Sequence, residues 1–297
     1  MLTHQNANPV APKRVVIVGS GGFVGSTIVK ELAKNKIPTV GLTRKEADLL
    51  SPGSADALKA QITRDDAVVF VSAVAPAKNA AQMMTNLRMV EAACIAFAAI
   101  PPAHLVYISS DAVYADDANP VTERSAVAPT TTHGMMHAAR ELMFRSDYKG
   151  PFAALRPTLI YGTGDPHSGY GPNRFRRQAA KGEPISIFGE GEEKRDHVAV
   201  EDVARLAVRI LLHRSEGALN AVTGVSTSFH DIAHIVARQF KPAAEVKSMA
   251  RPSSFVPHLL HRFFDIGDCY KSFPDFRFEP LAEGLARVHR EAAAGRP

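Results

Sequence analysis

Short, continuous apolar runs alternate along the chain with segments in which apolar residues recur at helical spacing. The strand-like runs occupy residues 14–18, 37–42, 65–75, 104–110 and 153–161. They are rich in β-branched residues and lack polar alternation, which is typical of strands buried on both faces. Helical spacing occurs between and after them, at residues 86–100, 134–144, 201–213 and 231–240. Strands that alternate with helices predict an α/β protein with a doubly wound parallel sheet.

Three glycines follow the first strand-like run, at intervals of three residues: Gly19, Gly22 and Gly25. Residues without a Cβ let the backbone approach a pyrophosphate, and the N–H groups at the start of the next helix attract its charge. The spacing is G-x-x-G-x-x-G rather than the commoner G-x-G-x-x-G, and a glycine-rich turn can also serve packing alone. Because strand and helix flank the glycines as the mechanism requires, we predict a Rossmann-type dinucleotide site here.

The end of the second strand bears on which nicotinamide cofactor is preferred. An NAD site usually has an Asp or Glu there for the ribose 2′-OH, whereas this strand runs into Thr43, Arg44 and Lys45. Arg44 could pair with a 2′-phosphate, so we expect NADP to be preferred over NAD; the alternative is a solvated loop charge. Asp48 and Leu49 would then lie beside the adenine.

Length and composition indicate a globular protein and limit the number of domains. The 297 residues are 45% hydrophobic and 22% charged, which fits a folded globular protein of one large domain or a domain with a lobe. We expect a flexible tail over residues 1–12, a dinucleotide-binding domain over 13–162 and a substrate lobe over 163–297, with about 195–222 returning to the first domain. The glycine- and proline-rich stretch 163–194 is expected to be irregular.

Charge and cysteine content address partners and location. The formal charge of +5 is modest and mostly scattered, which suits an anionic small molecule at least as well as nucleic acid, so no nucleic-acid partner is predicted. Residues 1–12 lack the features of a signal peptide, and no segment approaches the roughly 20 apolar residues of a membrane span. The two cysteines cannot form a disulfide framework. A cytoplasmic protein without membrane contact is expected.

Several motifs in order resemble the extended short-chain dehydrogenase/reductases, which include nucleotide-sugar epimerases, dehydratases and keto-reductases. The motifs are the three glycines, Ser109 to Tyr114, Arg156-Pro157, Arg195 to Val198 and Phe278 to Leu285. The resemblance implies a nicotinamide cofactor, a nucleotide-sugar substrate and a homodimer. Residues expected at the cofactor are Gly19, Gly22, Phe23, Val24, Gly25, Arg44, Asp48, Leu49, Ala73, Ala75, Asn86 and Pro157. It further implies that Asn173 and Arg195 contact the substrate diphosphate, with Arg174 as a helper.

The catalytic pattern of that family is altered in this chain. In the family a Tyr-x-x-x-Lys pair moves the proton and holds the ribose, and here those positions carry His133 and His137. Ser110 matches the catalytic hydroxyl and Asp111 the acid that follows it in the sugar dehydratases. An imidazole titrates near ~6.5 and can move a proton around neutral pH. We therefore expect His133 to be the acid/base, Ser110 to orient the reacting oxygen and His137 to bind the ribose.

Other interpretations of these histidines remain. His133 precedes a predicted helix, where polar capping residues are common. His-x-x-x-His could bind a metal, but no third ligand is evident and no metal is predicted. The expected function is NAD(P)-dependent epimerisation or keto-sugar reduction on a nucleotide sugar; the alternative is a catalytically silent NADP-binding sensor or assembly protein.

Overall fold

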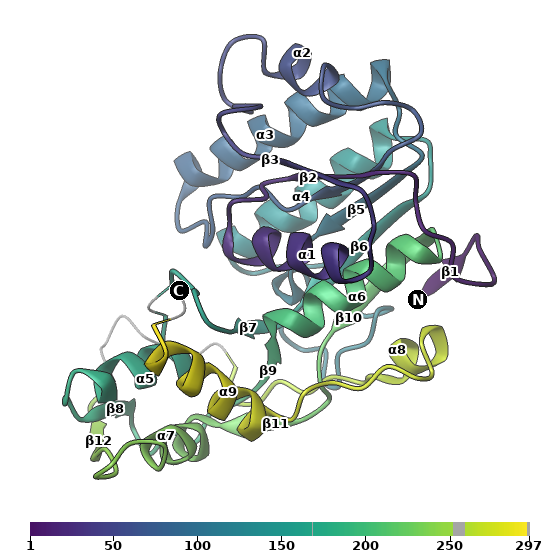
Figure 1. Ribbon diagram of the computed structural model, residues 1–297. Coiled ribbons are helices and arrows are strands. Elements are labelled where there is room, and N and C mark those ends of the chain that lie inside the picture. Colours follow the sequence, from purple (N-terminus) through teal and green to yellow (C-terminus); the bar gives the residue numbers. More distant parts are fainter. Residues whose placement is uncertain (168, 252–258, 296–297) are drawn as a thin grey trace.

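The computed structural model describes residues 1–167, 169–251 and 259–295, and Figure 1 shows a large sheet flanked by helices with a smaller lobe at one end. Within the described residues the sheet has the strand order β3-β2-β4-β5-β6-β10-β1, and all pairs are parallel except β10 with β1. Its strands are β1 (Leu2–His4), β2 (Val15–Val18), β3 (Thr39–Leu42), β4 (Ala67–Phe70), β5 (His104–Ile108), β6 (Phe152–Pro157) and β10 (Ser215–Ala221). The predicted doubly wound α/β fold is confirmed.

Helices cover both faces of this sheet. One face carries α1 (Phe23–Lys34) and α6 (Val200–Leu212); the other carries α2 (Ser54–Lys59), α3 (Ala80–Ala99) and α4 (Thr132–Asp147). Side chains alternate along β2, so that Val15 and Ile17 pack beneath α1 and α6 while Val16 and Val18 pack on the opposite face. Burial on both faces explains the continuous apolar runs of the sequence.

The amino-terminal segment differs from the expected flexible tail. Leu2–His4 forms β1 and pairs with β10 along the edge of the sheet, and the N–H groups of Asn6 and Val10 bond to carbonyls at the end of α6. Gly217 allows this approach, because a Cβ at that position would collide with the carbonyl oxygen of Met1. The prediction was wrong because the polar composition of the segment does not reveal its backbone pairing.

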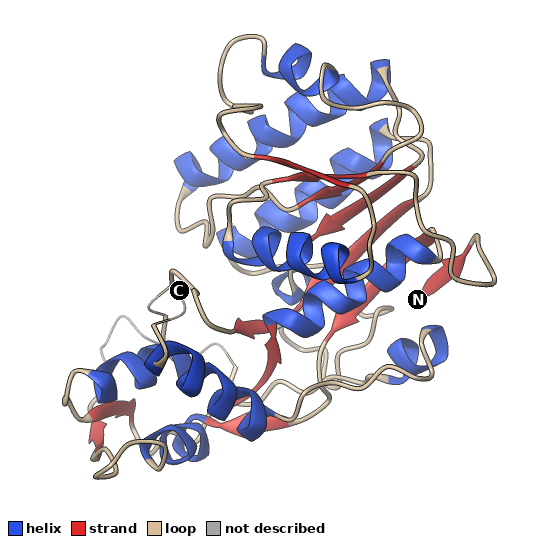
Figure 2. Cartoon of the chain, in the orientation of Figure 1, coloured by secondary structure: helices blue, strands red, loops and turns tan. Residues whose placement is uncertain are grey.

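The run predicted as one strand over 153–161 is two strands in different sheets. β6 ends at Pro157, and β7 (Leu159–Tyr161) joins β9 (Lys194–Ala199) and β11 (Ser226–Ser228) in the order β11-β9-β7. Thr158 lies at the break, where its hydroxyl donates to the carbonyl of Asp196 at 3.2 Å. The second sheet leads from the large domain into the lobe, as Figure 2 shows.

The lobe contains regular structure where an irregular segment was expected. Residues 163–194 include α5 (Pro172–Ala180) and β8 (Ile185–Phe188), and β8 pairs with β12 (Val246–Met249). Two further helices, α7 (Phe229–Ala237) and α9 (Leu281–Ala293), share a hydrophobic core with α5. The short α8 (Gly267–Ser272) lies beside β1 and β10, away from the lobe. No helix among the described residues is long and apolar enough to cross a membrane.

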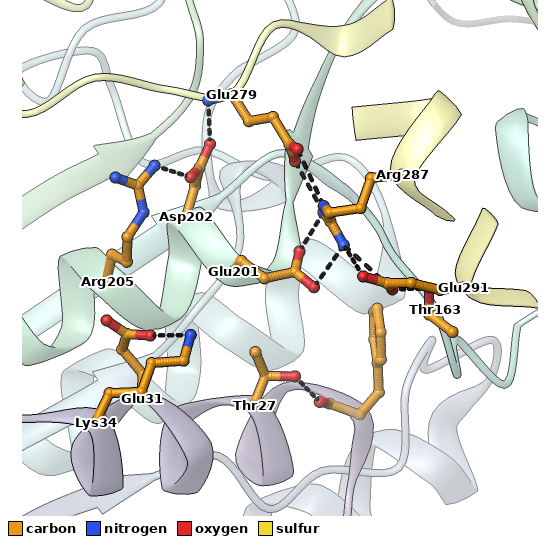
Figure 3. Close-up of polar contacts among 11 residues, drawn as sticks. Thr27, Glu31, Lys34, Thr163, Glu201, Asp202, Arg205, Glu279, Arg287 and Glu291 are labelled. Carbon is orange, nitrogen blue, oxygen red and sulfur yellow. Dashed lines mark hydrogen bonds and ion pairs between the residues drawn. The ribbon is translucent and has the colours of Figure 1, made fainter. Parts of the chain in front are cut away.

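A cluster of charged side chains fastens α9 to the large domain (Figure 3). Arg287 of α9 donates paired hydrogen bonds to Glu279, at 3.0 and 2.8 Å, and to Glu201 at the start of α6, at 2.9 and 2.7 Å. Glu291 lies 3.4 Å away and accepts a hydrogen bond from Thr163. These contacts join three parts of the chain that are distant in sequence.

Candidate functional site

Two cavities meet at the carboxyl ends of the parallel strands. One, of about 560 Å³, extends from the glycine turn into the lobe, and the other, of about 430 Å³, extends beside the end of β3. Gly19, Gly22, Val71 and Ala73 line both cavities, so the two are adjacent, and together they are called the groove below. In open α/β sheets this edge is where ligands bind.

The glycine turn builds the centre of the groove. Gly19 has φ +100°, and a Cβ there would lie 2.7 Å from the backbone nitrogen of Ser72, while a Cβ on Gly25 would collide with the carbonyl of Gly19. Helix α1 then starts with no side-chain cap and no acid in its first turn. Its free N–H groups and the positive end of its dipole suit a pyrophosphate. The predicted Gly19, Gly22, Phe23, Val24 and Gly25 all line the larger cavity.

The end of β3 borders the smaller cavity. Arg44, Asp48 and Leu49 line it, as the sequence predicts for the adenosine end. Arg44 makes no hydrogen bond or ion pair with a described residue, so its guanidinium is available to a ligand. Glu46, the nearest acid in sequence, accepts hydrogen bonds from the N–H and hydroxyl of Thr43 at 2.8 and 2.6 Å. The Glu46 carboxylate therefore stabilises its own turn and has both of these hydrogen bonds within it.

The remaining expected cofactor residues divide into two kinds. Ala73, Ala75 and Pro157 line the larger cavity. Asn86 does not: it is fully buried on α3, and its amide clasps Val74 by accepting from the backbone N–H and donating to the carbonyl, both at 2.9 Å. It holds the loop after β4 in place instead of facing the groove.

All four predicted catalytic residues line the larger cavity: Ser110, Asp111, His133 and His137. The two imidazoles stand perpendicular with ring centroids 4.7 Å apart on adjacent turns of α4. His133 is partly buried and its Nδ1 accepts a long hydrogen bond, 3.4 Å, from the N–H of Ala77. Burial, with His167 and Arg140 nearby, lowers the pKa of His133, which favours the neutral imidazole at neutral pH.

His137 is fixed from behind by a tyrosine. Its Nδ1 lies 2.6 Å from the hydroxyl of fully buried Tyr107, and burial raises the pKa of that phenol. The phenol therefore keeps its proton and donates it to Nδ1, which leaves the N–H of a neutral His137 on Nε2. Burial, followed by His133 and Arg140, lowers the pKa of His137 well below its ordinary value.

A buried cation lies behind both histidines. Arg140 follows them on α4, and its guanidinium sits 5.2 Å from the ring centroids of Phe70 and Tyr107. No ion pair among the described residues includes Arg140. The neighbouring carboxylate of Glu141 is instead bonded to Arg156, at 2.9 and 2.6 Å. The fixed charge opposes protonation of both imidazoles.

Ser110 and Asp111 follow β5 and line the same cavity as the histidines. The Ser110 hydroxyl accepts the N–H of Ala112 at 3.1 Å, which caps the short 3₁₀ turn Asp111–Val113. Arg262 reaches the Asp111 carboxylate at 3.6 Å and donates to its backbone carbonyl at 3.2 Å. Burial raises the pKa of Asp111, and Arg262 opposes that shift.

Of the three expected substrate residues, the structure brings one into the cavity. Asn173 lines it and donates a hydrogen bond to Asp165. Arg174 lies over the ring of Phe188, with its guanidinium carbon 5.8 Å from the centroid. Arg195 donates to the carbonyls of Leu259 and Leu260, so its guanidinium is occupied by backbone outside the cavity lining. Motif matching singled out these two arginines but could not show their partners.

Sequence reasoning missed residues that also line the cavity or control it. His167 and His197 line it, and Arg262 pairs with Asp111 from a distant segment. A histidine between the charged residues 194–196 and the apolar end of β9 was a visible signal for His197. Nothing near Arg262 in sequence indicates its partner. No group of three or more His, Cys, Asp and Glu side chains in the described part of the chain could hold a metal ion.

Comparison with known proteins identifies the family. Residues 15–223 match the model of the NAD dependent epimerase/dehydratase family. The chain belongs to this family. The matched residues include the glycine turn, Ser110 and β9.

Solved structures share the fold across nearly the whole chain. A GDP-L-fucose synthetase from Naegleria fowleri bound to NADP is 16% identical, covers 98% of each chain and has a TM-score of 0.83. UDP-N-acetylglucosamine 4-epimerase from Bacillus cereus is 20% identical, covering 93% of this chain and 95% of its own, with a TM-score of 0.79. UDP-glucose 4-epimerase from Thermotoga maritima with UDP-glucose is 19% identical, covering 96% and 100%, with a TM-score of 0.81.

Proposed function

We propose that this family member is an NADP-preferring oxidoreductase or epimerase that acts on a nucleotide-activated sugar. The observation that carries the proposal is the groove, which has the uncapped start of α1 at its centre. Arg44 lines the smaller cavity on one side, and Ser110, His133 and His137 line the larger cavity on the other. The groove continues into the lobe, which leaves room for a second ligand beside the cofactor. The family includes enzymes of this kind, and the fold matches nucleotide-sugar enzymes.

The residues of the groove fit the cofactor. The free N–H groups of α1 would hold the pyrophosphate, and Arg44 the 2′-phosphate of NADP. The Glu46 carboxylate near the end of β3 is hydrogen-bonded to Thr43, which leaves it poorly placed to bind the 2′-OH of NAD. NAD would lack the phosphate that Arg44 pairs with. When bound, the nicotinamide supplies an acceptor and donor of hydride at a sugar carbon.

The side chains then handle the proton. His133, neutral at neutral pH, takes the proton of the sugar hydroxyl as that carbon is oxidised and returns it on reduction. The Ser110 hydroxyl orients the same oxygen. His137, with its N–H on Nε2, donates a hydrogen bond to the ribose in place of the family lysine. Burial keeps both imidazoles neutral, and the positive charge of Arg140 adds to this effect.

We also propose a cytoplasmic homodimer. Large apolar side chains are exposed on the adjacent helices α3 and α4: Met84 and Ile95 on the first, Met135 and Leu142 on the second, with Leu142 67% exposed. Exposed apolar side chains on two helices that are in contact favour an interaction surface. Cys94 and Cys269 are free and buried, which suits a reducing compartment. Sedimentation velocity tests the dimer.

One experiment separates this function from the silent alternative. Thermal shifts are measured with NADPH, with NADH, and with a panel of UDP-, GDP- and dTDP-sugars in the presence of each dinucleotide, and every hit is assayed for turnover. Stabilisation by NADPH and a nucleotide sugar together, with product formed, supports the enzyme. Stabilisation by the dinucleotide alone supports a sensor or assembly protein.

A further inference from the structure

His197 is a buried imidazole at the edge of the larger cavity. It lies in the middle of β9, opposite Leu159 of β7, and only 3% of its surface is exposed. Neither ring nitrogen makes a hydrogen bond of ordinary geometry with a described residue. The ring stands at 88° to that of Phe229, with centroids 5.8 Å apart.

The ring borders the larger cavity. His197 lines that cavity together with Tyr170, Gly171 and Asn173 of the lobe. A Cβ built on Gly171 would lie 3.7 Å from the Nε2 atom of His197, so this nitrogen faces the glycine segment of the cavity wall. The position is on the lobe side of the groove, away from Arg44 and the adenosine end.

The other polar side chain that is buried on β9, Asp196, has hydrogen-bond partners within the protein. Asp196 points to the opposite face of the strand, and its carboxylate accepts hydrogen bonds from Thr223 at 3.1 and 2.8 Å and from the N–H of Gly224 at 2.7 Å. Buried polar groups in folded proteins are nearly always satisfied in this way. Of these two buried side chains of β9, only the imidazole, which borders the cavity, makes no hydrogen bond of ordinary geometry with a described residue.

The protonation state limits which ligand groups fit. Burial lowers the pKa of His197 to about 4, and the backbone of Arg195 offsets this only in part. A neutral imidazole has one N–H donor and one acceptor nitrogen. A hydroxyl group can accept from the first or donate to the second, whereas a phosphate oxygen can use only the N–H. Hydroxyls therefore match the ring better than the diphosphate does.

We propose that His197 is a substrate-binding residue that hydrogen-bonds hydroxyl groups on the sugar portion of the substrate. This inference rests on the proposed function and adds to it: the lobe side of the groove recognises the sugar itself, through β9, and not only the nucleotide.

The test uses three variants of the full chain. His197→Phe keeps the aromatic packing on Phe229 and removes both nitrogens; His197→Gln keeps a donor and an acceptor. His230→Phe makes the same exchange at an exposed position of α7 and serves as the control. Dissociation constants are measured for NADPH, and then, with NADPH bound, for UDP-glucose, GDP-mannose and dTDP-glucose, each against its own nucleoside diphosphate.

The expected results form a pattern that a structural role would not produce. His197→Phe should raise the dissociation constant of the nucleotide sugar roughly 10- to 100-fold, which corresponds to loss of one or two hydrogen bonds. His197→Gln should lose less, and NADPH and the nucleoside diphosphate should bind as in the wild type. The free His197→Phe protein should melt about 2 °C or more above the wild type, because an unsatisfied buried group is gone. His230→Phe should change none of these values.

Three results would overturn the inference. The first is unchanged binding of the nucleotide sugar by His197→Phe and His197→Gln; the second is equal weakening of the nucleoside diphosphate, which would place the base or diphosphate at His197. The third is a lower melting temperature of free His197→Phe with unchanged ligand binding, which would make the imidazole structural. If the wild type binds none of the nucleotide sugars, the proposed function fails, and this inference fails with it.

Discussion

Replacement of Arg287 by methionine tests how the lobe is held. The four short hydrogen bonds from Arg287 to Glu201 and Glu279 would be lost, and three carboxylates would be left close together. Exposed ion pairs contribute about 0–1 kcal/mol, and breaking a buried pair costs about 3–5 kcal/mol. Arg287 is 22% exposed and its partners 23–34%, so the screened cost is about 3 kcal/mol.

This cost translates into a melting temperature. Unfolding entropy of about 2.1 cal/mol/K per residue gives about 0.6 kcal/mol/K for a chain of this length. We therefore expect Arg287→Met to melt about 5 °C below the wild type in calorimetry. Arg290→Met, an exposed change on the same helix, is the control. Adding Glu201→Gln to Arg287→Met should recover part of the loss, because one of the repelling charges is removed.

The reasoning fails if Arg287→Met melts within about 1 °C of Arg290→Met, which would place the cluster among exposed ion pairs of negligible effect. It also fails if Glu201→Gln lowers the melting temperature of Arg287→Met still further, since the carboxylates would then not repel one another in the folded protein.

Three further predictions concern the groove and the core. His133→Ala should lower kcat at least about 100-fold while the NADPH dissociation constant stays within about 2-fold, and full turnover would remove His133 from the mechanism. Arg44→Ala should raise the dissociation constant of NADPH about 10-fold and leave that of NADH unchanged; equal effects on both would end the assignment to the 2′-phosphate. Burial lowers the pKa of His104 to about 4, from about 6.5 unfolded, so the stability it contributes is full above pH 6.5 and is lost as the pH falls toward 4. At pH 5 the loss is about 2 kcal/mol, and His104→Asn should flatten the urea-measured stability between pH 7 and 5 by that amount.

Much of the fold was predictable because burial on both faces leaves a direct mark on sequence. The runs at 14–18 and 104–110 coincide with β2 and β5, and the helical spacing at 201–213 with α6. The break at Thr158 left no such mark, since the residues on either side are apolar in both sheets. β1 was missed for the converse reason: three residues with one buried side chain carry too short a pattern to detect.

In the site, too, features set by local sequence were predictable and contacts between distant segments were not. Gly19 and Gly25, which are fixed by a local turn, were located by their spacing. His133 and His137, one helical turn apart, were located by their place in the family's catalytic motif. Contacts between distant segments were not: Arg195 ends on the carbonyls of Leu259 and Leu260, and nothing in its motif distinguishes a carbonyl partner from a phosphate. The direction of a side chain depends on packing that a single sequence does not record.

The short antiparallel pairing of β1 with β10 covers a strand edge that would otherwise be open to other molecules. Without those three residues, the seven-residue β10 would present a row of unsatisfied amides and carbonyls to solvent, and such rows recruit strands from neighbouring chains. A variant that lacks the residues of β1 should therefore aggregate on warming, and more so at higher protein concentration, although it would retain every residue of the groove.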